Sequence, residues 1–504
     1  MSSDILLKNC IARLSIYPIV LLFLFQISIA GQGFSSNLKI NHLTQGDQNT
    51  DGGNSIVVNG NNVYVLWQDL NTTFSSYISK STDGGTSFGN GIKIGGNDPH
   101  LFGAMAANNS GTLFTVWSGV VNDNLTGVYF SRSTDQAATF SSPVTISSDG
   151  FISQIAVNGD NVYVCFFRPK ADNKTGLFFA RSTNGGANFE TPYEVTDAVI
   201  GSNSVKFDSP NSISVDAQGN IFCIWNDGRR GGSGTDIYYA KSTNNGVSFG
   251  QNKMVNSVSG SVDKKRTAPS ISAYGSNLYV VWREEDDNNG SNRKIYFKKS
   301  TDGGSTFSTE YEIASNGFGS PSMNVSSKGE IYIAYPNYSG DKNGIFCTKS
   351  IDGGVSFPKT SFVNSTNADS KNPSLFVDAN DMIYSVWSDN RSSNDGVYFS
   401  KGTVTITGLD EKQDVIPAQF RLSQNYPNPF NPSTVIRVSI PVTQTASLKI
   451  YDFLGREIAT LINGRIEPGN YEIEFESGEL SSGIYLYRLQ TESFSQTRKM
   501  IIIK

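Results

Sequence analysis

The feature that most constrains this chain is an eight-residue turn that recurs six times. Its pattern is Ser-x-Asp-x-Gly-x-x-Phe, and the full copies are STDGGTSF at 81, STDGGSTF at 300 and SIDGGVSF at 350. Variant copies begin at 133, 182 and 242. A unit that returns at intervals of roughly fifty residues is typical of proteins built from similar small sheets, such as the blades of a propeller.

Two β-like segments come before each turn. The first is an apolar run that often ends in Trp, as in VYVLW at 63, and the second is an aromatic run that ends in a basic residue and Ser, as in YISKS at 77. Both patterns occur seven times, and the fifth unit shows four strands in PSISAY, LYVVW, KIYFKKS and YEIAS. We therefore predict an all-β chain with a seven-bladed β-propeller over residues 31–405, and six blades are the alternative.

The seventh unit has no good turn after Lys401, so its fourth strand is expected elsewhere. LKINHLT at 38 is similar to the fourth strands of other units, such as IKIGGND. Pairing of this N-terminal segment with the last unit would join the ends of the ring and leave no exposed sheet edge.

The recurring turn resembles the Asp box, or BNR repeat, of sialidase-like β-propellers. In that family the box joins the third and fourth strands of a blade, on the face opposite the active site. The resemblance implies a structural role for Asp83, Asp135, Asn184, Asn244, Asp302 and Asp352. Two copies carry Asn in place of Asp, and Ala137 replaces a Gly, which fits a hydrogen-bonded turn better than a catalytic carboxylate.

The loops at the other end of the predicted blades supply the candidate ligand site. Several of these loops begin with Trp-x-Asp, sometimes followed by Arg. This pattern places the following side chains on one rim: Asp69, Asp227, Glu284, Asp389, Arg229 and Arg391. Polar groups that converge on a funnel favour a binding site there. Trp67, Asp227 and Asp389 are candidate binding residues, although all five Trp occupy this one repeat position, which favours packing.

The resemblance to sialidases also implies candidate catalytic residues. In that family an arginine cluster binds the substrate carboxylate, and the candidates are Arg229, Arg266, Arg283 and Arg391. Tyr338 is the candidate nucleophile, with Asp69 and Glu284 as acid and helper. The chain departs from the family because it has no Phe-Arg-Ile-Pro motif, and no Arg between the predicted signal peptide and Ser81. Binding of glycans or a protein partner is therefore the favoured function, and an exo-α-sialidase-type glycoside hydrolase is the alternative.

Composition excludes several other classes of function. The formal net charge is -5 and no basic stripe is present, which argues against nucleic acid as a partner. Only two His occur, so we predict no cofactor and no His-rich metal site. DDNNG at 286–290 is as oxygen-rich as a calcium loop but lacks the downstream Glu, so a solvated loop is favoured. Cys165, Cys223 and Cys347 lie in apolar runs and are predicted to be buried thiols.

Both ends of the chain indicate export. Residues 1–30 have basic residues, an apolar run and a small-residue cleavage site, which predict a signal peptide whose removal leaves no integral membrane protein. Residues 406–419 are a predicted linker, and residues 420–504 a small antiparallel β-sandwich. NYPNPFNPST, LKIYDFLGRE and SSGIYLYRL in this module resemble the type A C-terminal sorting domain of type IX secretion substrates. The resemblance implies the type IX secretion machinery as a partner and a secreted or cell-surface location.

Overall fold

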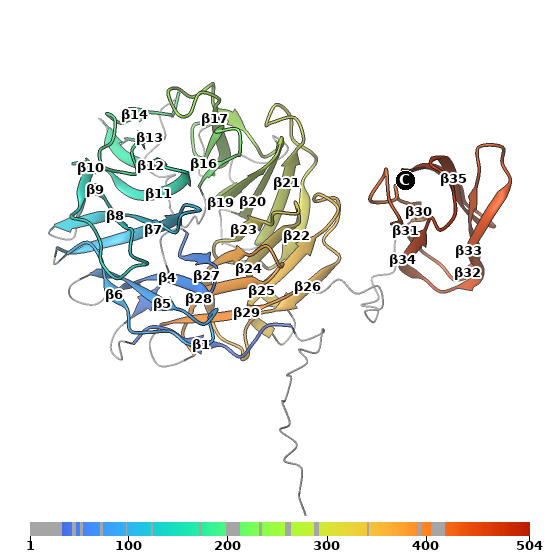
Figure 1. Cartoon of the computed structure of the whole chain (residues 1–504), viewed down its shortest axis with the longest axis horizontal. Coiled ribbons are helices and arrows are strands. Elements are labelled where there is room, and N and C mark those ends of the chain that lie inside the picture. Colours follow the sequence, from blue (N-terminus) through green and yellow to red (C-terminus); the bar gives the residue numbers. More distant parts are fainter. Residues whose placement is uncertain are drawn as a thin grey trace, which may run out of the picture. The chain divides into compact units, whose positions relative to one another are not determined.

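The computed structural model describes residues 33–503, with the gaps given below. The regular elements within these residues are all β-strands, β1 to β36 (Figure 1). The gaps in this range are residues 43–46, 51–53, 71–73, 97, 122–123, 171–173, 198–211, 231–233, 258–263, 287–291, 340–341, 392–394 and 405–418. The predicted signal peptide and nearly all of the predicted linker lie outside the described residues. No helix suited to spanning a membrane occurs in the described part.

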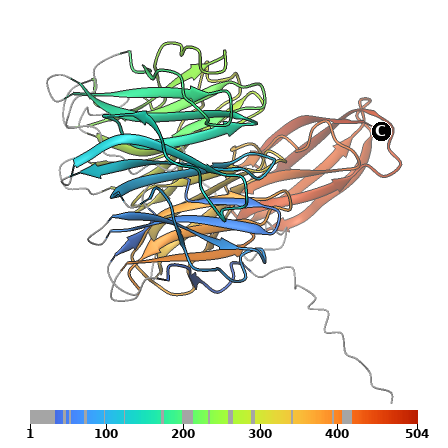
Figure 2. The same cartoon turned by 60° about the vertical axis from the view of Figure 1, so that its left-hand side comes forward.

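Seven antiparallel sheets follow one another between residues 38 and 402 (Figures 1 and 2). Sheet 1 contains β2 (Gln48–Asn49), β3 (Ile56–Asn59), β4 (Asn62–Asp69), β5 (Ser75–Ser81) and β6 (Ile92–Lys93). Sheet 2 contains β7 (His100–Ala107), β8 (Leu113–Val121), β9 (Asn124–Ser133) and β10 (Val144–Ser147). Sheet 3 contains β11 (Phe151–Asn158), β12 (Asn161–Lys170), β13 (Lys174–Ser182) and β14 (Tyr193–Glu194). Sheet 4 contains β15 (Ile213–Val215), β16 (Ile221–Asp227), β17 (Asp236–Ser242) and β18 (Lys253–Met254).

The remaining sheets keep this order. Sheet 5 contains β19 (Lys264–Tyr274), β20 (Asn277–Asp286), β21 (Lys294–Ser300) and β22 (Tyr311–Ser315). Sheet 6 contains β23 (Ser322–Val325), β24 (Ile331–Ser339), β25 (Lys342–Ser350) and β26 (Lys359–Phe362). Sheet 7 contains β27 (Ser370–Val377), β28 (Ile383–Asp389), β29 (Gly396–Gly402) and, as its fourth strand, β1 (Leu38–Lys39).

Sheet 7 is completed from the N-terminal side, as the sequence predicts. Leu38 pairs with Phe399 and Lys39 with Tyr398 in an antiparallel register. A backbone hydrogen bond of 2.9 Å from Ile40 N to Val397 O continues this pairing. The first and last parts of this region are therefore held together by main-chain bonds.

One strand of each sheet lies toward the centre of the arrangement, β3 in sheet 1 and the first strand in sheets 2 to 7. These strands contact one another in the order β3, β7, β11, β15, β19, β23, β27 and back to β3. All seven line a cavity of about 500 Å³. Ser hydroxyls link neighbours, since Ser374 Oγ accepts a bond from Ser55 N at 3.1 Å and Ser322 Oγ accepts one from Leu375 N at 3.3 Å.

Apolar cores fill the space between neighbouring sheets. The middle strands are buried on both faces because each sheet lies between two others, so their sequences are continuous apolar runs instead of alternating patterns. Trp67 of sheet 1, for example, shares a cluster with Val386 and Phe399 of sheet 7. Cys165, Cys223 and Cys347 are buried free thiols, as predicted.

Residues 421–502 form two further antiparallel sheets. One contains β30 (Arg421–Leu422), β31 (Ser433–Ile440) and β34 (Gly469–Glu476). The other contains β33 (Glu457–Ile466), β32 (Gln444–Tyr451), β35 (Gly483–Thr491) and β36 (Ser495–Ile502). Every second residue of β31 is buried, which is the pattern of a strand with one face on a core. Ile436, Leu448, Tyr487 and Met500 meet in that core, so the two sheets share one apolar interior.

Candidate functional site

The six octet turns, as we name the repeated Ser-x-Asp-x-Gly-x-x-Phe segments, connect the last two strands of each of sheets 1 to 6. In the first, Asp83 Oδ1 accepts hydrogen bonds from the Ser81 hydroxyl at 2.7 Å and from the amides of Thr86 and Ser87 at 2.9 Å. The Ser87 hydroxyl donates to Oδ2 at 2.6 Å. These donors, led by Ser87, hold the pKa of Asp83 well below its usual range. The carboxylate is thus an acceptor that shapes its own turn.

The two Asn variants keep the same turn with one bond reversed. Asn244 Oδ1 accepts from the Ser242 hydroxyl at 2.8 Å and from Ser248 N at 3.0 Å. Its amide group then donates to the Ser248 hydroxyl at 2.9 Å, where an Asp would accept. The geometry therefore explains why Asn is tolerated, since the turn needs one fixed acceptor and no negative charge.

Each octet turn is also held by the preceding sheet, a feature that the sequence analysis missed. A basic side chain at the end of the third-strand motif of one sheet, before Ser in five cases and before Gly402 in the sixth, reaches the fourth position of the next octet turn. The bonds are Lys401–Gly84 O at 2.7 Å, Arg132–Gly185 O at 2.6 Å, Arg181–Asn245 O at 3.0 Å, Lys241–Gly303 O at 3.1 Å, Lys299–Gly353 O at 2.6 Å and Lys80–Gln136 Oε1 at 3.3 Å. The recurring basic residue at the end of this motif was the available signal.

The fifth position of each octet turn packs against an aromatic ring of the preceding sheet. A Cβ placed on Gly186 would lie 2.1 Å from the Phe130 ring, and one on Gly85 would lie 2.6 Å from Phe399. Ala137 is the exception, and it shares its apolar cluster with Ile78. Ile78 stands where Phe130 and Phe399 stand in their strands. The Ala is therefore matched to a non-aromatic neighbour instead of being a degraded copy.

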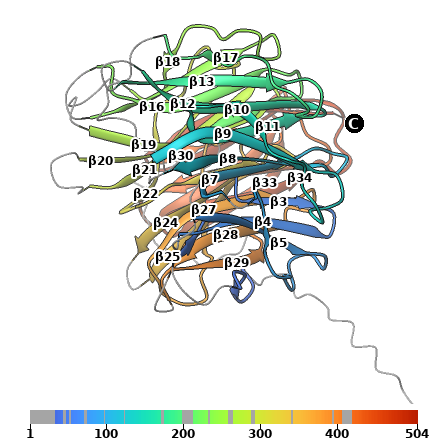
Figure 3. The same ribbon diagram turned by 90° about the vertical axis from the view of Figure 1, so that its left-hand side faces the viewer.

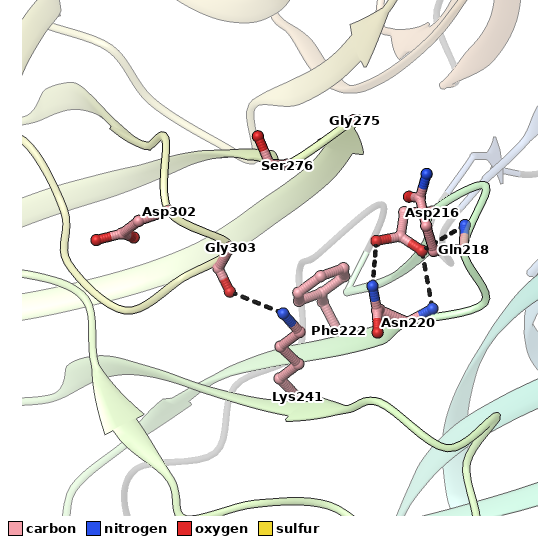
Figure 4. A pocket seen from close by; sticks show the side chains of 9 residues that line it. All are labelled: Asp216, Gln218, Asn220, Phe222, Lys241, Gly275, Ser276, Asp302 and Gly303. Atoms are coloured by element: carbon pink, nitrogen blue, oxygen red, sulfur yellow. Dashed lines mark hydrogen bonds between the residues drawn. The ribbon is translucent and has the colours of Figure 1, made fainter.

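A pocket of about 320 Å³ opens between sheets 4 and 5, beside an octet turn (Figure 4). Its charged groups already have partners within the protein. Asp216 Oδ1 accepts from the amides of Gln218 and Asn220, and Lys241 donates to Gly303 O (Figure 4). Few charged groups of this pocket are therefore free to bind a ligand.

Figure 3 shows the sheets from the side, with loops at both ends of the strands. Asp69, Asp227 and Asp389 lie at the ends of β4, β16 and β28, opposite the octet turns. Two of these loops contain the same arrangement, which we call the Trp-Asp-Arg clip. In sheet 4, Asp227 is fully buried and accepts from Trp225 Nε1 at 3.0 Å and from Arg229 Nη2 at 2.6 Å. The Arg229 guanidinium covers the Tyr238 ring at 4.3 Å. Arg229 also bonds Asp197 at 2.6 Å, so two carboxylates balance its charge.

Sheet 7 repeats the clip with Trp387, Asp389 and Arg391. Trp387 Nε1 donates to Asp389 Oδ2 at 2.8 Å, and Arg391 Nε donates to Asp389 Oδ1 at 2.8 Å. The guanidinium covers Tyr398 at 4.1 Å. Arg229 and Arg391, predicted as catalytic, and Asp227 and Asp389, predicted as binding residues, thus bond each other within their own loops.

Arg266 and Glu284 belong to a buried ionic network between sheets 4 and 5. Arg266 Nε donates to Glu284 Oε2 at 2.8 Å, and its Nη1 donates to Asp236 Oδ1 at 3.0 Å. Lys264 reaches the other Glu284 oxygen at 2.5 Å, and Arg230 bonds Asp236. Burial of such charges requires partners, and each of these groups has one. Both carboxylate oxygens of Glu284 thus bond cationic side chains, which leaves neither free to assist a nucleophile.

The other predicted site residues are dispersed. Trp67 has an exposed fraction of 0%, stacks on Tyr77 at 4.6 Å and donates to the Ser79 hydroxyl, so it packs in the core and its ring is not available to a ligand. Asp69 is buried at the end of β4. Arg283 Nη2 lies 3.8 Å from Glu285.

Tyr338 differs from the other candidates because it is 45% exposed. Its hydroxyl lies 3.4 Å from Asp369 Oδ1. Partial burial, followed by the charge of Asp369, raises the pKa of Tyr338, which disfavours the phenolate that a nucleophile requires.

No group of three potential metal ligands occurs within the described ranges. Most of the oxygen-rich segment 286–290 lies outside them, so its calcium hypothesis stays a prediction. The six structural positions predicted in the octet turns, including Asp302 and Asp352, all accept bonds from their own turns.

Comparison with protein families matches residues 424–504 to the secretion system C-terminal sorting domain. The chain is therefore a type IX secretion substrate, located outside the cell or on its surface. No curated protein matches the chain.

Solved structures similar to this chain include glycan-active enzymes. A polysaccharide lyase, the PL25 ulvan lyase bound to -[GlcA(1-4)Rha3S]-, has a TM-score of 0.53 at 11% identity, covering 72% of this chain and 95% of the lyase. Another structure of a PL25 ulvan lyase has a TM-score of 0.50 at 11% identity, covering 73% and 93%. The α-L-arabinofuranosidase Arb93A of Fusarium graminearum has a TM-score of 0.42 at 14% identity, covering 60% and 93%. At these identities the likeness to the lyases supports the fold alone.

Proposed function

We propose that sheets 1 to 7 form a closed, seven-bladed β-propeller that binds glycans outside the cell, and that the two C-terminal sheets form a β-sandwich that directs its secretion. The cyclic order of contacts among the central strands and the pairing of β1 with β29 support the closed ring. The glycan-active neighbours of similar fold and the sorting domain agree with a role in extracellular glycan recognition.

One observation favours binding over sialidase-type hydrolysis. The arginines proposed to hold a substrate carboxylate are already paired: Arg229 with Asp227, Arg391 with Asp389, and Arg266 with Glu284. A guanidinium that is paired and stacked in its own loop has few donors left for a ligand carboxylate. An arginine cluster of the sialidase type would need these pairs to break.

The test uses the purified full chain on a glycan array and in a fluorogenic sialoside assay. We expect binding to one class of glycan and no release of the fluorophore. Sialoside turnover that is lost in the Arg391→Ala and Tyr338→Phe variants would contradict the proposal. Absence of binding to every glycan would contradict it as well.

A further inference from the structure

Tyr338, near the end of β24 in sheet 6, stacks on the half-buried Phe318 of the connection between sheets 5 and 6. Their ring centroids lie 4.2 Å apart with an interplanar angle of 20°. Although Phe318 stacks on the ring, Tyr338 remains 45% exposed, so much of the residue is open to solvent. An exposed aromatic ring that is backed by a second ring offers a flat apolar surface, with its phenol group as a polar tip.

The pair is held rigidly by the main chain. Phe318 N donates to Pro336 O at 3.1 Å, two residues before Tyr338, and Gly317 forms a β-bridge with Asn337. Gly319 has a φ of 71°, and a Cβ there would lie 3.0 Å from Pro336. A ring fixed in this way loses little conformational entropy when a ligand stacks on it.

Polar groups suited to hydroxyls border the exposed ring. Asp369 Oδ1 accepts from the Tyr338 hydroxyl at 3.4 Å and from Asn343 Nδ2 at 2.8 Å, and Asn390 Nδ2 lies 3.5 Å from Oδ2. Asn343 Oδ1 is buried and has no hydrogen-bond partner among the described residues. Because this oxygen is buried, the groups that a sugar hydroxyl can reach here are the Asp369 carboxylate and the amide nitrogens of Asn343 and Asn390.

The charges beside the ring disfavour acidic sugars. The Asp369 carboxylate lies next to the Tyr338 hydroxyl, and Arg293, the cation that acts on Tyr338, is paired with Glu285 at 3.4 Å. Arg391, on the same rim, forms an ion pair with Asp389. A like charge at close range suppresses binding of anionic ligands.

We infer that Tyr338, backed by Phe318 and bordered by Asp369 and Asn343, is a stacking subsite for a neutral pyranose or furanose unit of a glycan. The C–H face of the sugar stacks on the exposed ring of Tyr338, and its hydroxyls bond the carboxylate and amide edge. This inference rests on the proposed glycan binding and names the ligand class of that function. It also gives Tyr338 a stacking role in place of the nucleophilic role implied by the sialidase resemblance.

The experiment measures binding of the purified full chain to cellotetraose, xylotetraose and arabinotetraose by calorimetry, with 3′-sialyllactose and tetragalacturonic acid as acidic comparators. We expect at least one neutral oligosaccharide to bind and neither acidic one to bind more tightly. Tyr338→Ala should weaken that binding roughly tenfold, because a stacked contact is lost. Tyr338→Phe, which keeps the ring, should remain within about threefold of the parent chain.

Tyr274→Ala is the matched control. Tyr274 is also exposed, at 37%, but it is the last residue of β19 in sheet 5, and its hydroxyl donates to Ser327 O. This variant should bind like the parent chain, and thermal melting of all variants separates loss of binding from loss of folding. Asp369→Asn removes a negative charge beside the ring, so it should reduce the difference in affinity between neutral and acidic oligosaccharides.

Three results would overturn the inference. If the parent chain binds glycans but Tyr338→Ala binds equally well, the subsite is elsewhere and the proposed function stands. If only acidic glycans bind, the assignment of a neutral ligand is wrong. If the parent chain binds no glycan, here or on the array, both proposals fail.

Discussion

At the scale of single residues, the fifth position of each octet turn depends on the side chain of the neighbouring sheet that packs against it. Five of the six turns have Gly at the fifth position, and each of these packs beneath a Phe or Tyr of the preceding sheet. Where that sheet presents Ile78, the turn has Ala137 instead. Position five is therefore set by the size of a side chain on the preceding sheet, as well as by its positive φ.

This pairing predicts a coupled effect of two substitutions. Gly186→Ala should lower the free energy of unfolding by about 2 kcal/mol, because the new Cβ clashes with Phe130 at a positive φ. Phe130→Ile combined with Gly186→Ala copies the natural Ile78–Ala137 pair, and we expect it to be less destabilised than the sum of the two single variants. Denaturant melts of the four proteins measure the coupling, and strictly additive effects would contradict the argument.

The carboxylates of the octet turns predict sensitivity to acid. Hydrogen bonds led by the Thr139 hydroxyl lower the pKa of Asp135 from its ordinary value of 3.8 to about 2. Because the folded-state pKa is the lower one, this stabilisation is complete above the ordinary pKa and is lost as pH falls from about 4 toward 2. The pKa values of Asp83 and Asp302 are lowered in the same direction.

Asp135→Asn should therefore reduce the dependence of the melting temperature on pH between about 4 and 2. The octet turn with Asn244 in this same chain shows that a neutral side chain at this position still forms the turn. An unchanged pH dependence in this variant would show that the turn carboxylate does not couple to folding.

At the scale of strands and turns, the sequence patterns predicted much of the fold. The four strands of the fifth unit correspond to β19 to β22, and the LKINHLT segment supplies β1. Apolar runs and Gly-rich turns carry this information locally. Arginine partners are harder to predict, because Asp236 and Arg266 lie on different sheets and meet only after folding. The Trp-x-Asp spacing predicts polar groups that face a ligand, whereas in the structure the Asp of each clip bonds its own Trp and Arg.

The cation links between sheets lead to a prediction at this scale. Lys401 connects β29 to the first octet turn through Gly84 O, across the junction of sheets 7 and 1. Lys401→Met keeps the aliphatic stem but removes this charged hydrogen bond, and should cost about 1 kcal/mol of unfolding free energy. Lys93→Met, an exposed change on β6, is the control and should have little effect. Equal effects of the two changes would contradict a specific link.

At the scale of the whole molecule, the account depends on closure of the seven sheets. The order of contacts returns from β27 to β3, and β1 pairs with β29, so a strand from before sheet 1 completes sheet 7. Such closure protects the last sheet edge and lets each end of the strands present a separate surface. The octet turns occupy one end, and Tyr338 with the two clips occupies the other.

Hydrogen exchange measured by mass spectrometry on the purified full chain tests closure most directly. Peptides that contain residues 35–40 and 396–402 should be protected together, at a level close to that of the middle strands of sheets 2 to 6. A chain that lacks residues 31–42 should lose protection in 396–402 first. Rapid exchange of residues 35–40 in the parent chain, with the remaining sheets still protected, would contradict the closed ring.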